Sequence, residues 1–193
     1  MDLSAETDEN LMMRFGRGDA AAFDALYRRH EAKVFRYLFR CVRDQASAND
    51  LMQEVWFAVA RSAQRYEPTA KFTTWLFTLA HNRMIDLIRK SRPMQSLDAD
   101  VDGDAADGGL VDRIAGDPRL EPQADAQTRD EAQALMSAVA RLPTEQRTAF
   151  LLQAEGDLSL EDIAAATGAS FETVKSRLRY ARAKLRQLLW EYA

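Results

Sequence analysis

Cysteine and histidine are scarce in this 193-residue chain, which has one cysteine, Cys41, and two histidines, His30 and His81. One cysteine cannot form an internal disulfide, and these three residues do not have the spacing of a zinc site. We therefore expect no metal and no cofactor, and we expect Cys41 to be a small buried hydrophobic residue. No Ser-His-Asp, Cys-His or phosphate-loop arrangement is present, which argues against an enzyme.

Long hydrophobic runs are also absent. No apolar run approaches the roughly 18 residues that a membrane span requires, and the N-terminal segment is acidic where a signal peptide would be basic. We therefore expect a cytoplasmic protein that does not insert into membranes. The hydrophobic content of 47% is enough to bury the core of one ordinary domain or of two small ones.

The net charge of -4 hides a pattern along the chain. Residues 94–127 hold nine acidic and two basic groups, whereas residues 61–93 hold seven basic and two acidic groups, and residues 168–193 hold six and two. Two basic segments therefore flank one acidic segment. This pattern suits a polyanion that is bound at two places.

Residues 94–127 have no aromatic residue, repeated aspartates, four glycines and two prolines. Such a composition is typical of a flexible linker. It divides the chain into an N-terminal module, residues 1–93, and a C-terminal module, residues 128–193. A flexible linker permits the two modules to pack together in the free protein without requiring it.

The rest of the chain has helical periodicity, so the predicted class is all-α. In the first module we expect a helix over 20–42 that is capped by Asp19, a second from a Ser47–Asp50 capping box to about 65, and a third over 73–91. The first of these helices should contribute apolar-face residues to the core: Phe23, Leu26, Tyr27, His30, Val34, Tyr37, Leu38 and Cys41.

In the second module we expect a helix from a Thr128–Glu131 capping box to about 141, and another that Pro143 opens and that ends near 156. A short helix capped by Ser159 and Asp162 should follow and end at Gly168, and Ser170 should cap a last, basic helix. A short helix, a tight turn and a longer basic helix have the sequence shape of a helix-turn-helix, whose second helix enters the major groove of DNA.

The last helix divides into two faces at 100° per residue. One face is an apolar stripe of Val174, Leu178, Ala181, Leu185 and Leu188; the other carries Glu172, Lys175, Ser176, Arg179, Arg182 and Arg186. Like charges four residues apart repel each other, and phosphate contacts would relieve that repulsion. Ser170, Glu172, Thr173, Lys175 and Ser176 are placed for base edges, and the later arginines for phosphates. A merely solvated charged face is the alternative.

The third helix of the first module carries a similar face of Trp75, Thr78, Asn82, Arg83, Asp86, Arg89 and Lys90. Trp75 is placed to stack on an exposed base, Asn82 to read a base edge, and the cations to hold phosphates. Packing of Trp75 in the core is equally compatible with the sequence.

The second helix instead presents an acidic stripe with a phenylalanine in it, formed by Asp50, Gln53, Glu54, Phe57 and Arg61. Acidic groups repel DNA, so this stripe is a candidate for binding a basic protein partner. A solvated face with one tolerated phenylalanine is the alternative.

Together these segments resemble a bacterial RNA polymerase sigma factor of the extracytoplasmic-function (ECF) group. "ANDLMQEVWFAVARSAQRYEP" is similar to the family's polymerase-binding helix and "FTTWLFTLAHNRMIDLIRK" to its promoter-melting helix. "GDAAAFDALYRRHEAKVFRYLFRCV" resembles its opening helix, and "LPTEQRTAFLLQAEGDLSLEDIAAATGASFETVKSRLRYARAKLR" its minus-thirty-five-reading domain.

The resemblance implies partners and roles. Core RNA polymerase would be bound through Asp50, Leu51, Gln53, Glu54 and Phe57. Single-stranded minus-ten DNA would be bound through a loop at about 64–72 and through Phe72, Trp75, Asn82, Arg83, Asp86, Arg89 and Lys90. Double-stranded minus-thirty-five DNA would be bound through Ser170, Phe171, Glu172, Thr173, Lys175, Ser176, Arg179, Arg182 and Arg186.

The resemblance also implies that the linker threads through the polymerase and that an anti-sigma protein controls the chain. His81 departs from the small or basic residue that many relatives have beside Asn82. The chain ends soon after the basic helix, so we expect no C-terminal regulatory domain. Two rival hypotheses remain open, namely an autonomous dimeric helix-turn-helix regulator that reads paired half-sites and a helical adaptor that binds only proteins.

Overall fold

The computed structural model describes Leu3, residues 5–91 and residues 126–190. Every regular element within these ranges is helical and none is a strand, which confirms the all-α prediction. The predicted linker lies outside the described residues except for its last two positions, which begin a helix. In the described part of the chain, no helix combines the length and the apolarity that a membrane crossing needs.

The N-terminal module consists of α1 (Asp8–Gly16), α2 (Ala20–Val42), α3 (Gln45–Ser62), a short 3-10 turn η1 (Ala63–Arg65) and α4 (Phe72–Ser91). The predicted cap of α2 is confirmed, because the Asp19 carboxylate accepts a hydrogen bond from the Ala21 N–H at 3.1 Å. Helix α1 was not predicted. The Thr7 hydroxyl caps it, and Leu11 and Met12 bury its apolar side.

Two details of this module differ from the prediction. Helix α3 begins at Gln45, and its cap is Asp44, whose carboxylate accepts from the Ser47 N–H at 2.8 Å, so the predicted Ser47–Asp50 capping box is wrong. Tyr27 is 36% exposed instead of buried, because its ring lies at the edge of the core against the Trp56 ring, with 4.9 Å between the ring centroids.

The C-terminal module consists of α5 (Ala126–Ala140), α6 (Thr144–Gly156), α7 (Leu160–Thr167) and α8 (Phe171–Trp190). The capping box of Ser159 and Asp162 at α7 is confirmed. Gly168 ends α7 at a φ of 66°, in the left-handed region that glycine adopts without strain. The predicted capping box at Thr128 is wrong, because α5 begins two residues earlier.

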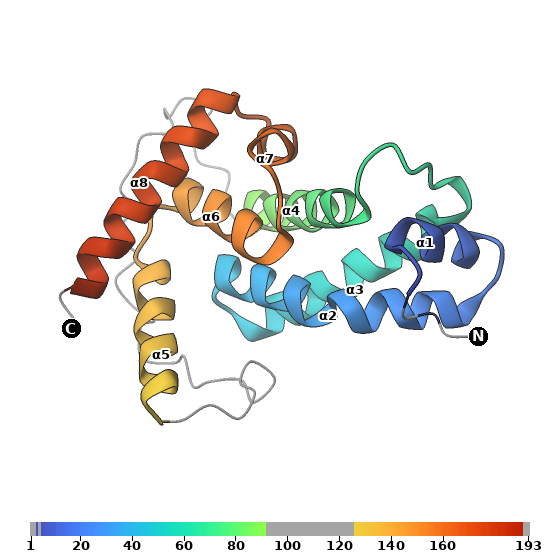
Figure 1. Ribbon diagram of the computed structural model, residues 1–193, viewed down its shortest axis with the longest axis horizontal. Helices are drawn as coiled ribbons and strands as arrows, with labels where there is room; N and C mark the ends of the chain where they lie inside the picture. Colours follow the sequence, from blue (N-terminus) through green and yellow to red (C-terminus); the bar gives the residue numbers. More distant parts are fainter. Residues whose placement is uncertain (1–2, 4, 92–125, 191–193) are drawn as a thin grey trace.

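The two modules pack directly against each other. Helix α6 lies against α2, and α7 lies against α4 (Figure 1). Buried side chains of both modules belong to one continuous hydrophobic core, which includes Phe77 of α4 and Leu158 before α7. The described structure is therefore a closed arrangement, in which the predicted helix-turn-helix touches the predicted promoter-melting helix.

Candidate nucleic-acid interface

Helices α7 and α8 form a helix-turn-helix around Gly168. The Ser170 hydroxyl caps α8 by accepting from the Thr173 N–H at 3.1 Å, as predicted. The predicted apolar stripe of α8 is buried along its whole length and packs the helix onto its module: Val174, Leu178, Ala181, Leu185 and Leu188. This packing fixes which side of α8 faces outward.

The outward side of α8 is the basic face, which we define as Lys175, Arg179, Arg182 and Arg186. Two of its cations make solvent-exposed contacts within the protein. The Lys175 Nζ lies 3.7 Å from the Glu172 carboxylate, and the Arg182 guanidinium donates to the Gln153 side-chain oxygen at 2.7 Å. Exposed pairs of this kind contribute little to stability, so the charges remain available to a phosphate.

Most residues predicted for the minus-thirty-five site are exposed on α8 or its cap. The structure leaves Ser176 half-buried and exposes the others: Ser170, Phe171, Glu172, Thr173, Lys175, Arg179, Arg182 and Arg186. In contrast, Arg177 on the flank of α8 is half-buried and forms an ion pair with Glu145 of α6, so it holds two helices of the module together.

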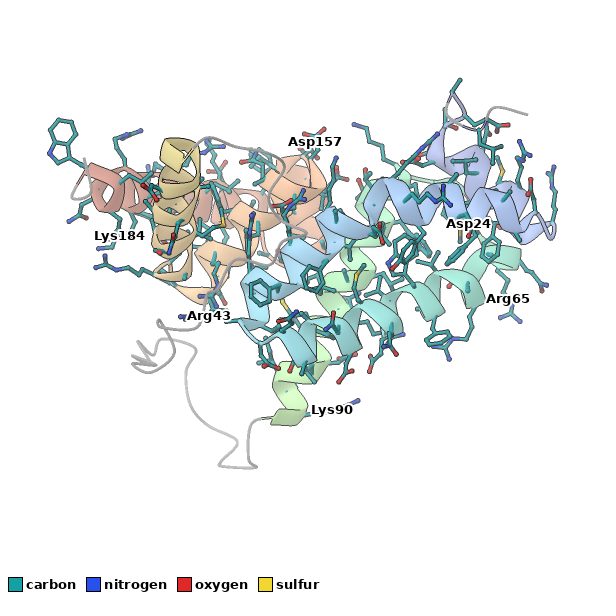
Figure 2. All side chains as sticks on the ribbon, turned by 90° about the horizontal axis from the view of Figure 1, so that it is seen from below. Asp24, Arg43, Arg65, Lys90, Asp157 and Lys184 are labelled. Atoms are coloured by element: carbon teal, nitrogen blue, oxygen red, sulfur yellow. The ribbon has the colours of Figure 1, made fainter. Side chains whose placement is uncertain are left out.

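Helix α4 presents the second predicted DNA face. Asn82, Asp86, Arg89 and Lys90 are exposed, and Arg83 is half-buried. Figure 2 shows Lys90 at the end of α4 that projects from the body, well separated from Lys184 on α8. The two candidate faces therefore lie in different parts of the closed molecule.

Phe72 is the predicted DNA residue that the structure contradicts. Its side chain has no exposed surface, because its ring fills the core between Tyr66, Trp75 and His30. A direct contact with DNA is thus excluded in this conformation, and Phe72 anchors the start of α4 instead. Trp75 is half-buried, with its ring 5.3 Å from the Tyr66 ring, so it packs in part and is exposed in part.

The predicted polymerase-binding face lies on α3. Asp50, Gln53, Glu54 and Phe57 are all exposed there, and Phe57 is 66% exposed. Leu51 is only 2% exposed, so its predicted contact with a partner is corrected: it belongs to the core beneath this face. The exposed Phe57 ring beside acidic groups keeps this face a candidate for contact with a basic protein partner.

A shallow hollow of about 330 Å³ adjoins the exposed Phe57 ring. It is lined by Glu54, Phe57 and Arg61 of α3 and by Arg83 of α4. Because α4 also carries the candidate DNA face, the acidic face of α3 and the basic face of α4 meet at this hollow. A partner seated on α3 would therefore lie next to nucleic acid held by α4.

A buried ion pair joins the two modules. Glu155 near the end of α6 is 8% exposed, and its carboxylate accepts from the guanidinium groups of Arg36 and Arg40 on α2. The distance from Arg36 Nε to Glu155 Oε2 is 2.9 Å. A carboxylate loses its hydration when it is buried to this extent, and the two guanidinium groups replace that hydration with hydrogen bonds.

Backbone groups add to the same contact. The buried Arg147 of α6 donates to the carbonyl oxygens of Ala140 and Leu142 in its own module and, at 3.4 Å, to that of Cys41 in the other module. Gly156 has no room for a side chain, because a Cβ there would lie 2.9 Å from the Phe77 ring of α4. The two modules therefore approach each other at Gly156 more closely than a side chain at this position would allow.

Cys41, His81 and Tyr37 lie buried beneath this contact. Burial raises the pKa of the Cys41 thiol to about 12, so it is a neutral hydrophobic group at neutral pH, as predicted from the sequence. Burial also lowers the pKa of His81 to about 4, and its Nδ1 lies 3.0 Å from the Tyr37 hydroxyl. His81 is therefore a neutral core residue, not a DNA contact beside Asn82.

The sequence analysis missed the residues of the module contact. Arg147 and Glu155 are eight residues apart on α6 and share a face with Leu151, which is buried. Two opposite charges on an apolar stripe are an unusual pattern and indicate a buried pairing with another element. That signal was present in the sequence, although it does not name Arg36 and Arg40 as the partners of Glu155.

Comparison with known proteins gives two family matches and close relatives. Residues 26–93 match Sigma-70 region 2, and residues 132–185 match Sigma-70, region 4. The ECF RNA polymerase sigma factor RpoE of Cereibacter sphaeroides is 35% identical over 96% of this chain and 97% of its own length. The chain belongs to the ECF group of RNA polymerase sigma factors. The RNA polymerase sigma-H factor of Pseudomonas aeruginosa is 33% identical over 93% of this chain and 92% of its own length.

Two solved structures have a similar fold. The sigma factor RpoE of Bartonella quintana, in complex with the anti-sigma factor NepR, matches with a TM-score of 0.61 and 26% identity over 81% of this chain and 89% of its own. CnrH in complex with the cytosolic domain of CnrY matches with a TM-score of 0.65 and 23% identity over 97% and 100%. The latter likeness shows the fold alone.

Membership of this family settles the general function. ECF sigma factors catalyse no reaction; they bind core RNA polymerase and direct it to promoter elements through regions 2 and 4. This sigma factor is therefore a promoter-specificity subunit with core RNA polymerase and promoter DNA as partners. The predicted family and the predicted non-enzymatic function are confirmed.

Proposed function

We propose that the two modules divide promoter recognition between them. The N-terminal module, residues 1–93, docks on polymerase through the exposed face of α3 and captures the opened minus-ten strand on α4. The C-terminal module, residues 128–193, reads the minus-thirty-five element with α8. The observation that carries this assignment is the exposed basic face of a capped α8 whose opposite stripe is wholly buried.

The minus-thirty-five step needs only rigid docking. With its apolar stripe packed, α8 enters a major groove with Lys175 and the residues of its first turn near base edges, and its later arginines near phosphates. Contacts to phosphates fix the register, and contacts to bases give the sequence preference.

The minus-ten step needs an opened duplex. Asn82 is exposed and has both a donor and an acceptor for a base edge, while the exposed Arg89 and Lys90 hold the strand. The half-exposed face of Trp75 provides a surface on which a base can stack. Capture of unstacked bases in this way offsets the cost of unpairing the duplex.

Promoter binding requires that the closed arrangement opens. Elements about 25 base pairs apart are separated by about 85 Å at 3.4 Å per base pair. A compact chain of this length has a radius of gyration of only about 16 Å. The 34 residues between α4 and α5 can reach about 110 Å when extended, so they can span the gap once the module contact is broken.

Control by an anti-sigma protein fits the same surfaces, and the similar sigma factor RpoE of Bartonella quintana was solved with such a partner. A protein that covers the Phe57 face of α3, or that holds the modules closed, would block polymerase docking or promoter reach. We place this activity in the cytoplasm, where polymerase and promoters are found.

The test of the function is binding of the labelled protein to purified bacterial core RNA polymerase, followed by transcription from a genomic promoter library with that mixture. Tight binding with selective initiation is expected. Tight binding to a palindromic DNA site without polymerase would instead support an autonomous regulator. Function that survives reversal of Arg179 and Arg182 to glutamate would support a protein-only adaptor.

Glu54→Lys is expected to weaken binding to core polymerase at least tenfold, because it reverses the charge beside the exposed Phe57 without disturbing buried groups. Asp24→Lys, a reversal of an exposed carboxylate on α2, is the matched control and should bind like the wild type. Equal affinities of Glu54→Lys and the control would rule out the docking role of α3.

Arg179→Ala is expected to weaken recognition of the minus-thirty-five element by about 1 to 3 kcal/mol, as is Lys175→Ala, if each reads a base. Lys184→Ala is the control, because Lys184 is an exposed cation on the opposite flank of α8 from the basic face. Binding is measured with holoenzyme on promoters that carry or lack the upstream element. Identical losses in all three variants would indicate general electrostatics instead of a reading face.

A further inference from the structure

The loop between η1 and α4 is held at both ends by α1. At the first end, Gly16 of α1 lies against the backbone of η1 so closely that a Cβ on it would lie 2.3 Å from the Ala63 carbonyl oxygen. At the second end, the Glu9 carboxylate of α1 accepts from the Phe72 N–H at 2.7 Å. These two points are seven residues apart on α1, or about 10 Å along a helix.

The Glu9 carboxylate supplies α4 with a hydrogen-bond acceptor that the residue just before the helix does not provide. The first N–H groups of a helix need acceptors, which a side chain just before the helix usually provides. The residue at that position is Lys71, whose side chain has donors only. Glu9 therefore caps α4 from another helix and places a negative charge at its N-terminus, where the helix dipole favours it.

Helix α1 is itself fixed to the module at the same place. The Asp8 carboxylate contacts Arg29 and, at 2.7 Å, the buried His30 of α2, whose ring lies 5.5 Å from the Phe72 ring. Burial alone would raise the pKa of Asp8, but the hydrogen bonds from His30 and Arg29 outweigh it and lower that pKa, so the Asp8 carboxylate is ionised at neutral pH.

The loop folds back onto these anchors while its tip stays in solvent. The Tyr66 ring packs against the Phe72 and Trp75 rings, and burial together with the nearby charges of Glu9 and Asp8 raises the pKa of Tyr66 to about 12. The next five residues, 67–71, are all exposed. An exposed tip between two fixed ends is suited to present itself to a ligand in one conformation.

We propose that α1 is a brace that sets the conformation of loop 66–71 and that Glu9 is thereby a positioning residue for minus-ten selectivity. This inference rests on the proposed assignment of the loop and α4 to minus-ten capture. Helix α1 lies before the segment that matches Sigma-70 region 2, which begins at residue 26, so the brace is not part of that match.

The experiment uses the full chain with core polymerase and a promoter library that is randomised across the minus-ten element. Glu9→Ala removes the acceptor at one end of the loop, and Gly16→Ala forces η1 away at the other end. Each is expected to reduce discrimination between preferred and non-preferred minus-ten sequences about fivefold, the size of a lost helix cap. Affinity for core polymerase and preference at the minus-thirty-five element should not change.

Two further variants separate positioning from general stability. Glu9→Gln keeps an acceptor oxygen and should restore most of the selectivity, and Asn10→Ala, an exposed neighbour on α1, should behave like the wild type. Unchanged minus-ten discrimination in both Glu9→Ala and Gly16→Ala would overturn the brace. If the wild-type holoenzyme shows no minus-ten preference, the proposed function fails first, and that failure is recognised without any variant.

Discussion

Glu155→Arg is expected to convert the free sigma factor from the closed to the open arrangement. The substitution replaces the buried carboxylate between Arg36 and Arg40 with a third guanidinium, so attraction becomes repulsion in a desolvated contact. Loss of one partner of a buried ion pair costs about 3 to 5 kcal/mol. Since each 1.4 kcal/mol is a factor of ten, the ratio of open to closed molecules should rise at least a hundredfold.

Small-angle X-ray scattering measures this change as an increase in the radius of gyration of the free protein. The matched control is Glu145→Arg, a reversal on the same helix α6, because Glu145 pairs with Arg177 inside the C-terminal module. Only Glu155→Arg should expand the molecule, and its circular dichroism should stay helical. A compact Glu155→Arg protein would show that this ion pair does not hold the modules together.

The opened variant should also load onto polymerase more readily. A binder whose competent state is rarely populated loses apparent affinity in proportion to that population. If core polymerase binds only the open form, Glu155→Arg should therefore bind core polymerase more tightly than the wild type does. The exposed docking face of α3, with its Phe57, is unchanged by the substitution.

The second large effect is a loss of stability in mild acid that depends on His81. Burial lowers the folded-state pKa of His81 from 6.5 to about 4. Between these values the unfolded chain binds a proton that the folded chain does not. The stability gained by a neutral His81 is thus fully present above pH 6.5, falls as the pH drops towards 4, and changes no further below it. The total loss is about 3 kcal/mol.

Urea unfolding at pH 7, 6, 5 and 4.5 measures this loss when the wild type is compared with His81→Gln, which does not titrate. The free energy of unfolding of the wild type should fall more steeply with decreasing pH, whatever the offset between the two proteins at pH 7. Carboxylates such as Asp8 and Asp19, whose pKa values lie below 3.8 in the folded protein, lose their contribution only at lower pH. Parallel curves would mean that His81 is hydrated.

Much of the fold could be predicted because its signals are local. The Asp19 cap, the Ser159 capping box and Gly168 each mark a helix end within four residues, and the apolar stripe of α8 follows from spacing alone. Helix α1 also had local signals, a threonine cap and the apolar pair Leu11 and Met12. These signals are short, and the acidic charge of the same segment instead suggests an exposed, unstructured terminus.

Two features could not be predicted from the sequence: how deeply a motif residue is buried, and which residues far apart in the sequence contact each other. Family motifs include Leu51 and Phe72 without indicating whether a motif residue contacts a ligand or supports one that does, and both side chains are buried. The contact of Arg36 and Arg40 with Glu155 joins positions more than a hundred residues apart in sequence. Periodicity along one helix contains no information on which other helix will face it.

The position of Cys41 allows the opening of the closed arrangement to be measured as a rate of thiol labelling. It is the only thiol in the chain, it is buried on α2, and the side chain of Thr148 on α6 hydrogen-bonds to it. A thiol-specific reagent therefore reacts in molecules in which this contact has opened, and not in the closed arrangement. At low reagent concentration the labelling rate reports the fraction of opened molecules, and at saturating reagent it equals the opening rate constant. Core polymerase or an anti-sigma protein added to the unmodified chain would shorten or lengthen that time, so the natural sequence can report its own activation without an engineered probe.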